Sequence, residues 1–194
     1  MPNEAAHDML APALSLGPVA LNVQNLERMK EFYTSVIGLE VLTESNDIVL
    51  LGQKKTAIIE LHKRPDLPRS IPGDAGLYHH AIVFSSRSLL AQAVERVLHY
   101  VPHLFAGSAD HLVSEAFYLS DPEGNGMELY YDRDPATWTW VNGEVKMATL
   151  YLSPDVYINL HAPKKDTVTM HIFHVHLKIG YLEQAQKFYI DTIG

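Results

Sequence analysis

The chain has 194 residues, of which 47% are hydrophobic and 20% are charged, and this balance is typical of a globular protein with a sizeable core. Its formal net charge of -8 excludes nonspecific binding to nucleic acid or to an anionic membrane surface through a basic face. Cysteine is absent, so any metal must be bound through nitrogen and oxygen atoms. No signal-peptide pattern and no run of about 20 apolar residues is present, and we expect a soluble, cytoplasmic protein.

A repeated segment organises the chain. Residues 19–38 align without a gap with residues 175–194, and eight of the twenty aligned positions are identical. The identities are Val19/Val175, Leu21/Leu177, Leu26/Leu182, Glu27/Glu183, Phe32/Phe188, Tyr33/Tyr189, Ile37/Ile193 and Gly38/Gly194. The alignment indicates that one structural unit occurs more than once.

The first copy begins a unit of one strand, one helix and three strands. The alternation over 18–23 predicts a strand, and Asn25 is the expected N-cap of a helix over 26–37 with apolar residues at helical spacing. Gly38 suits the end of that helix, where a left-handed conformation is favoured. Three strand-like runs follow at 39–43, 47–51 and 56–62.

A second unit with the same order follows. Residues 78–84 predict a strand, and Ser85 or Ser86 is the expected cap of a helix over 89–100. Further strands are predicted near 103–105, over 115–119 and over 126–132, with the turn DPEGNG before the last of them.

These units give an α+β fold with a definite domain plan. Residues 16–133 form one domain of two βαβββ modules, about 16–65 and 76–133, and 134–168 form a linker. Residues 169–194 start a second such domain, and we expect the chain to be truncated there. A lone strand and helix leave apolar surface exposed, so we expect a homodimer.

The paired modules, the FYxxxIG helix end and the closing motif DPEGNGMELY resemble the vicinal oxygen chelate superfamily, which contains glyoxalases, bleomycin-binding proteins and extradiol dioxygenases. The stretch from LYHHA to DPEGNGMELYYDR looks most like the bacterial catechol-2,3-dioxygenase-like branch. The resemblance implies that two modules face each other in a cupped half-barrel sheet around a divalent metal. It implies ligands on the first and last strands of each module, which we expect at opposite margins of its four-stranded sheet.

Aligning the modules with that pattern places Pro18 and Glu60 at the ligand positions of the first module, His79 and Glu128 at those of the second, and His174 at the first position of the third. The resemblance thus implies a metal site that draws on His79, Glu128, Glu60 and His174. Imidazole and carboxylate ligands suit divalent metals, with Fe(II) favoured and Mn, Ni or Zn possible.

Proline cannot coordinate a metal, so Pro18 departs from the family pattern and leaves three interpretations open. The site uses Glu60, His79 and Glu128; or it is vestigial and catalysis belongs to the second domain, with His174 as a ligand; or the cup binds a small molecule without metal.

Three further residues are candidates for catalysis. His111 precedes a strand that should line the cup and is suited to acid–base work on a catechol hydroxyl. Tyr118 and Tyr130 can donate phenolic hydrogen bonds to a substrate oxygen. For each of the three, a surface or packing role is the alternative.

The leading interpretation is a metal-dependent enzyme that binds an aromatic diol or a dicarbonyl-type small molecule, with extradiol cleavage of a catechol as the reaction. The alternatives are a glyoxalase-like isomerase, a metal-free small-molecule binder of the bleomycin-resistance kind, and an inactive truncated family member.

Overall fold

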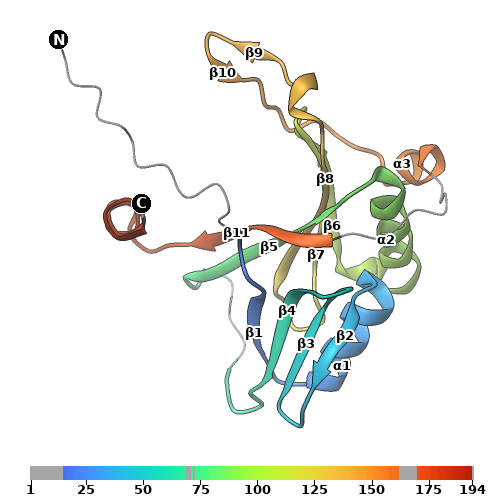
Figure 1. Ribbon diagram of the computed structural model, residues 1–194, viewed down its shortest axis with the longest axis vertical. Helices are drawn as coiled ribbons and strands as arrows, with labels where there is room; N and C mark the ends of the chain where they lie inside the picture. Colours follow the sequence, from blue (N-terminus) through green and yellow to red (C-terminus); the bar gives the residue numbers. More distant parts are fainter. Residues whose placement is uncertain (1–14, 69–70, 72, 162–169, 194) are drawn as a thin grey trace.

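The computed structural model describes residues 15–68, 71, 73–161 and 170–193, and within them two four-stranded units share one topology (Figure 1). In the first unit the sheet order is β1-β4-β3-β2, and β1 and β4 are parallel neighbours. Its elements are β1 (Val19–Val23), α1 (Leu26–Glu31), the π-helix η1 (Phe32–Ile37), β2 (Glu40–Glu44), β3 (Ile48–Gln53) and β4 (Thr56–Lys63).

The ends of the first helix are set by the residues that the sequence predicts. The Asn25 side chain accepts a hydrogen bond from the backbone N–H of Arg28 at 3.0 Å, which confirms Asn25 as the N-cap. Gly38 has φ +93° and its N–H donates to the Tyr33 carbonyl, so the helix ends in the left-handed conformation that glycine allows. Between these ends the helix widens into the π-helical turn η1, which periodicity alone does not predict.

The second unit repeats this order, and its sheet is arranged β5-β8-β7-β6. Ser86 caps α2 by accepting from the backbone N–H of Leu89, as expected. The strand predicted near 103–105 is wrong in its position, because Pro102 begins a 3-10 turn and the strand starts at Phe105. The elements are β5 (Gly76–Phe84), α2 (Arg87–Tyr100), η2 (Pro102–Leu104), β6 (Phe105–Asp110), β7 (Ser114–Ser120) and β8 (Gly126–Asp132).

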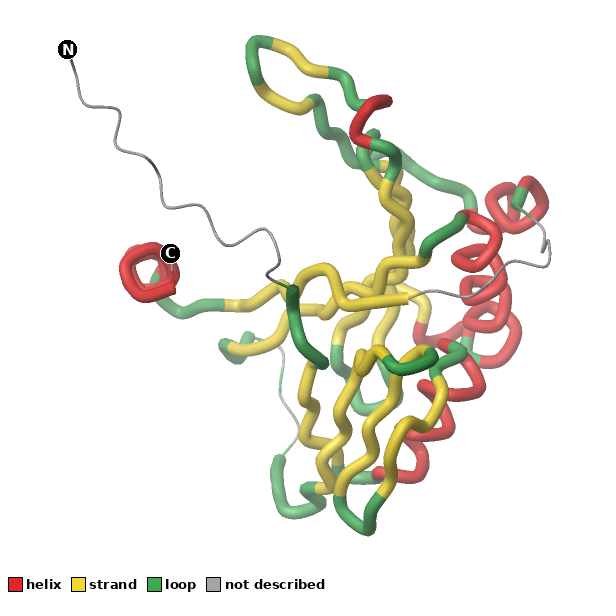
Figure 2. The backbone as a smooth tube through the Cα atoms, in the orientation of Figure 1, coloured by secondary structure: helices red, strands yellow, loops and turns green. Residues whose placement is uncertain are grey.

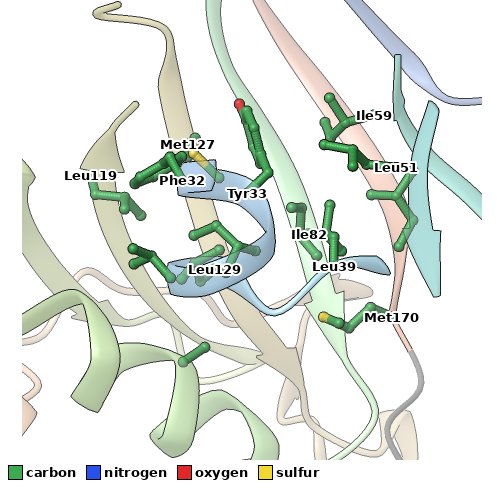
Figure 3. Packing of buried hydrophobic residues seen from close by; sticks show 14 of the residues in the cluster. Phe32, Tyr33, Leu39, Leu51, Ile59, Ile82, Leu119, Met127, Leu129 and Met170 are labelled. Atoms are coloured by element: carbon green, nitrogen blue, oxygen red, sulfur yellow. The ribbon is translucent and has the colours of Figure 1, made fainter. Parts of the chain in front are cut away.

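One hydrophobic core joins the two units. The π-helical turn η1 carries Phe32 and Tyr33 toward the second sheet, where they lie beside Met127 and Leu129 (Figure 3). The turn between β7 and β8 also holds the first unit, because the Glu123 carboxylate accepts the backbone N–H groups of the residues that lead into α1. These contacts fix the first unit against the second.

Residues 134–161, predicted as a linker, contain a small two-stranded ribbon that projects from the body (Figure 2) and a helix that packs on α2. Tyr157 of that helix is buried against the core. The elements are η3 (Pro135–Thr137), β9 (Trp140–Val141), β10 (Glu144–Val145) and α3 (Pro154–Leu160). The rest of the predicted linker, residues 162–169, lies outside the described part of the chain.

The third copy of the repeat supplies β11 (Met170–Lys178), α4 (Leu182–Phe188) and the π-helix η4 (Tyr189–Ile193). Strand β11 pairs antiparallel with β5 and makes the second sheet five-stranded, in the order β11-β5-β8-β7-β6. The sequence predicts one cup from the first and second modules, whereas in the structure these modules form separate sheets and the third copy extends the second. The expected margins are also wrong, because the first and last strands of each module are neighbours.

None of the helices in the described residues is both long enough and apolar enough to cross a membrane.

Candidate metal centre

Three side chains of metal-binding type meet on one face of the second sheet. His79 lies on β5, Glu128 on the adjacent strand β8, and His174 on β11 at the other side of β5. The Nε2 atoms of His79 and His174 lie 3.1 and 3.2 Å from Glu128 Oε2, and 3.2 Å from each other. Each of three neighbouring strands therefore contributes one possible ligand to a single point.

The alternation of β5 explains why this face is available for chemistry. Ile82 and Phe84 belong to the main core, whereas Ala81 and Val83, on the same side as His79, pack in a small separate cluster with Tyr130. Ala81 pairs with His174 on one side and with Glu128 on the other, and its small side chain leaves room for the larger side chains of the three strands to approach each other. The core face anchors the sheet, and the opposite face carries His79, Glu128 and His174.

Glu128 is ionised although it is 5% exposed. Burial opposes the loss of its proton, but the hydrogen bonds and charges of His174 and His79 outweigh burial and lower the pKa of the carboxyl to about 2. A buried carboxylate is stable only when it is paired or coordinates a metal. The two imidazoles supply that compensation in the structure, and a divalent cation would supply more.

The donor set fits a divalent metal ion. Three ligand atoms on one face of an octahedral site, each about 2.1 Å from the ion, lie about 3 Å from one another. The separations of 3.1 to 3.2 Å between the Nε2 atoms of His79 and His174 and Oε2 of Glu128 match this spacing. Two histidines and one carboxylate on one face, with the remaining positions open, are the ligand set of non-haem Fe(II) oxygenases.

His111 and Tyr118 form a hydrogen-bonded chain that ends at this carboxylate. Tyr118 lies on β7 directly opposite Glu128, and its hydroxyl is 3.2 Å from Glu128 Oε1 and 2.8 Å from His111 Nε2. His111 Nδ1 is 2.9 Å from the Ala148 carbonyl, which can only accept, so Nδ1 carries a hydrogen. Nε2 of a neutral His111 then accepts from Tyr118.

The direction of this chain depends on one proton. When Nε2 of His111 is also protonated it donates to the Tyr118 oxygen, and Tyr118 turns its own hydrogen to Glu128. Burial and the Glu128 charge raise the pKa of Tyr118, so the phenol keeps its proton and serves as a donor. The phenol can therefore donate a hydrogen bond either to His111 or to Glu128 while it stays protonated.

The third catalytic candidate, Tyr130, also lies at the cluster. Tyr130 follows Glu128 by two positions on β8 and so faces the same side of the sheet, with its ring 5.8 Å from the ring of His174. Burial and the charges of Asp132 and Glu128 raise the pKa of Tyr130, which keeps its hydroxyl protonated.

Glu60 does not join the site. Its carboxylate lies 2.5 Å from His62 Nε2 on the same strand of the first sheet, and the cluster of described residues contains only His79, Glu128 and His174. The interpretation that combines Glu60 with His79 and Glu128 is therefore wrong. His174, the residue of the third repeat that is equivalent to Pro18, lies in the cluster.

A groove of about 1040 Å³ adjoins the cluster and is lined by His79, His111 and Tyr118. Tyr78 and Lys178 line it as well, and the sequence analysis did not single them out. Alternation along the strand predicts that Tyr78 faces away from its neighbour His79, so no sequence signal marked Tyr78 as part of the groove. Nothing in the sequence marks Lys178, because its place depends on the pairing of β11 with β5.

Comparison with known proteins places this site in context. The sequence model described as Glyoxalase/Bleomycin resistance protein/Dioxygenase superfamily matches residues 15–129. A catechol-2,3-dioxygenase of Bacillus subtilis (strain 168) is 35% identical over 188 residues, which cover 92% of this chain and 64% of that protein. The chain thus spans less than two thirds of the length of this relative.

Solved structures share the fold at lower identity. A glyoxalase/dioxygenase from Nostoc punctiforme aligns with a TM-score of 0.54 and 21% identity over 67% of this chain and 100% of its own. A glyoxylase/bleomycin resistance protein/dioxygenase domain from Frankia sp. EAN1pec aligns with a TM-score of 0.52 and 16% identity over 63% of this chain and 94% of its own. The α+β architecture is therefore that of the vicinal oxygen chelate proteins.

Proposed function

Since the chain belongs to the Glyoxalase/Bleomycin resistance protein/Dioxygenase superfamily, we propose that it is a metal-dependent dioxygenase in which His79, Glu128 and His174 hold one divalent metal ion. The ion that we favour is Fe(II), and Mn, Ni or Zn would fit the same donors. The observation that carries the proposal is the convergence of two imidazole nitrogens and one carboxylate oxygen from three adjacent strands, 3.1 to 3.2 Å apart.

The reaction is extradiol cleavage of a catechol-type substrate, as the name of the Bacillus subtilis relative suggests. A divalent ion held by these residues would act as a Lewis acid that lowers the pKa of the diol hydroxyls, and it would supply the activation of O2. The ring carbon–carbon bond beside the diol breaks and both atoms of O2 enter the open-chain product, so no further reductant is needed.

The residues of the chain bind the substrate and handle its proton. His111 accepts the proton that the diol loses on binding, with Nδ1 held by the Ala148 carbonyl so that Nε2 faces the site. Tyr118 stays protonated and donates a hydrogen bond either to His111 or to Glu128, according to the charge on His111. Tyr130 limits the site beside His174 and offers a second phenolic donor to a substrate oxygen.

The test is anaerobic loading with Fe(II), followed by elemental analysis and an oxygen-electrode trace with catechol. We expect one metal ion per chain and one O2 consumed per catechol in the wild type, and neither in His79→Ala. His103→Ala removes an exposed histidine of η2 and is the matched control, which should behave as the wild type. Retention of metal by His79→Ala at wild-type stoichiometry, or no O2 uptake by the fully loaded wild type, would refute the proposal.

The same experiment distinguishes two alternative functions. A glyoxalase-like isomerase would use the same ligands but convert a dicarbonyl-type substrate without consuming O2. A metal-free binding protein would hold a small molecule in the groove of about 1040 Å³ with no bound metal.

Self-association is part of the proposal. Helix α4 has no buried residue, and Leu182 and Phe188 are 71% and 52% exposed. Apolar side chains that are this exposed on one helix favour a contact with a second copy. We expect light scattering to give the mass of a dimer, and a monomeric mass would contradict this expectation.

A further inference from the structure

The groove beside the candidate metal centre is much larger than a bare diol needs. Its volume of about 1040 Å³ is at the upper end of the roughly 300–1,000 Å³ found for sites that bury drug-sized ligands. His79 of the ligand cluster is one of its lining residues, so a six-membered ring held at the cluster would occupy only part of it. The remainder indicates a substrate with a further group that reaches away from the diol.

Most of the charged groups that line this groove are already paired. Arg64 forms an ion pair with Asp66 at 3.3 Å. The Glu123 carboxylate accepts the backbone N–H groups of Gln24 and Asn25 at 2.8 and 2.7 Å, where it holds the start of α1. Neither side chain is therefore free to select the charge of a ligand.

Lys178 is the exception. It lies at the end of β11, four residues beyond His174, and its Nζ is 5.4 Å from the centre of the Tyr78 ring. No carboxylate in the described part of the chain lies within ion-pair distance of it. In a chain with a net charge of -8, an uncompensated ammonium group in the groove is a local site for an anion.

An aromatic wall connects this lysine with the ligand cluster. The Tyr78 ring is 5.3 Å from the ring of His79 and 4.9 Å from the ring of His176, and Lys178 lies over it. Tyr78 is 51% exposed, so its face is available for a substrate ring or chain. The wall runs from a metal ligand at one end to a cation at the other.

We propose that the substrate is an aromatic diol with a carboxylate-bearing side chain, and that Lys178 binds the carboxylate while the diol lies at His79, Glu128 and His174. This inference rests on the proposed function, and it names the class of substrate. Four residues of extended strand separate the backbones of His174 and Lys178 by about 13 Å, and the lysine side chain lies over the Tyr78 ring, which is itself 5.3 Å from the His79 ring. An acidic chain on the diol ring can reach toward Lys178, and an unsubstituted catechol has no group that can.

The test compares catechol with 3,4-dihydroxyphenylacetate. For the Fe(II)-loaded wild type, kcat/KM should be at least about tenfold higher for the acidic diol, as expected for one charge-assisted hydrogen bond. Lys178→Met replaces the ammonium-bearing side chain with an uncharged one of similar length, so the ratio of kcat/KM for the two diols should fall to about one. Lys146→Met, at an exposed lysine next to the β9–β10 ribbon, should keep the preference.

A binding measurement separates this inference from the proposed reaction. The dissociation constants of the two diols are measured by calorimetry with the Zn(II)-loaded wild type and with Zn(II)-loaded Lys178→Met. Tighter binding of the acidic diol that disappears in Lys178→Met supports the inference even if the Fe(II) protein turns over neither diol. Equal discrimination by wild type and Lys178→Met, in binding or in turnover, overturns it.

Discussion

The proposal that the third repeat provides a metal ligand is tested by His174→Ala. The His174 side chain is 39% exposed, so its removal leaves no cavity in the core, but it takes away one of the two imidazoles that compensate the buried Glu128 carboxylate and should cost the metal-free protein about 1–3 kcal/mol. Each protein is therefore compared with itself, with and without metal. The effect of the substitution on the site is then seen in the response to metal. This separates a loss of the site from a loss of the fold.

The expected response follows from linkage between binding and folding. A metal ion at one hundred times its dissociation constant stabilises the native state by about 2.7 kcal/mol if it does not bind the unfolded chain. For a chain of this size each 1 kcal/mol raises the midpoint of thermal unfolding by about 2–4 °C, so the wild type should gain about 5–10 °C. Changes to groups behind a metal ligand already cost about 10–100-fold in affinity, and loss of His174 itself should cost at least as much. A hundredfold loss leaves about 0.4 kcal/mol, or about 1 °C.

The assay is thermal unfolding followed by circular dichroism, with and without Mn(II), which avoids oxidation by air. Wild type and His103→Ala should show the full metal-dependent rise, and His174→Ala should show almost none. Should His174→Ala rise as much as the wild type, the contribution of the third repeat to the site would be refuted. A lost rise in His103→Ala would mean that the wild-type response comes from nonspecific binding.

Three other substitutions test separate parts of the structure. Tyr118→Phe removes the hydroxyl 3.2 Å from Glu128 and should weaken metal binding about tenfold in a chelator competition, with no loss of folding. Glu115→Gln removes the charge of a buried carboxylate that accepts hydrogen bonds from two arginines and one tyrosine. The free energy of unfolding, measured in urea, should fall by about 3 kcal/mol. Burial opposes ionisation of Glu115, but the arginines lower the pKa of its carboxyl below the ordinary value. The ionised carboxylate therefore stabilises the fold fully at a pH above the ordinary pKa, and this stabilisation is lost as the pH falls through the lowered pKa. The wild type should accordingly lose its stability advantage over Glu115→Gln in acid. Gly126→Ala places a Cβ against the Tyr78 carbonyl and should push β8 from β5, with a cost of about 1–3 kcal/mol and weaker metal binding, whereas Gly17→Ala, where a Cβ meets nothing, should do neither.

The parts of the fold that the sequence predicts are those with local causes. Asn25 and Ser86 cap their helices and Gly38 ends the first one, because each acts through contacts within a few residues. The repeat itself is visible because the same local pattern recurs. The predicted start of β6 was wrong because the turn at 102–104 directly precedes the strand, and sequence patterns do not locate such a boundary to within a few residues.

The candidate cluster brings together only some of the residues that module alignment proposed. The alignment put His79 and His174 at the first-strand position and Glu128 and Glu60 at the last-strand position, and Glu60 lies in the other sheet. Which sheets join is decided by contacts between residues far apart in the chain, and no short pattern records them. For the same reason Lys178 and Tyr78 could not be recognised as neighbours.

The pairing of β11 with β5 explains why a single repeat cannot complete the site. His80 and Val175 hold equivalent positions in the second and third repeats, and they pair directly with each other across the two strands. Antiparallel strands that meet at equivalent residues are related by an approximate two-fold axis, which places the preceding positions, His79 and His174, diagonally on either side of it. Within one repeat the last strand reaches only one edge of the first strand, so Glu128 can approach His79 from that side alone. The second imidazole has to come from the first strand of another repeat across the free edge, and the histidine at position 174 meets that requirement where Pro18 of the first repeat cannot.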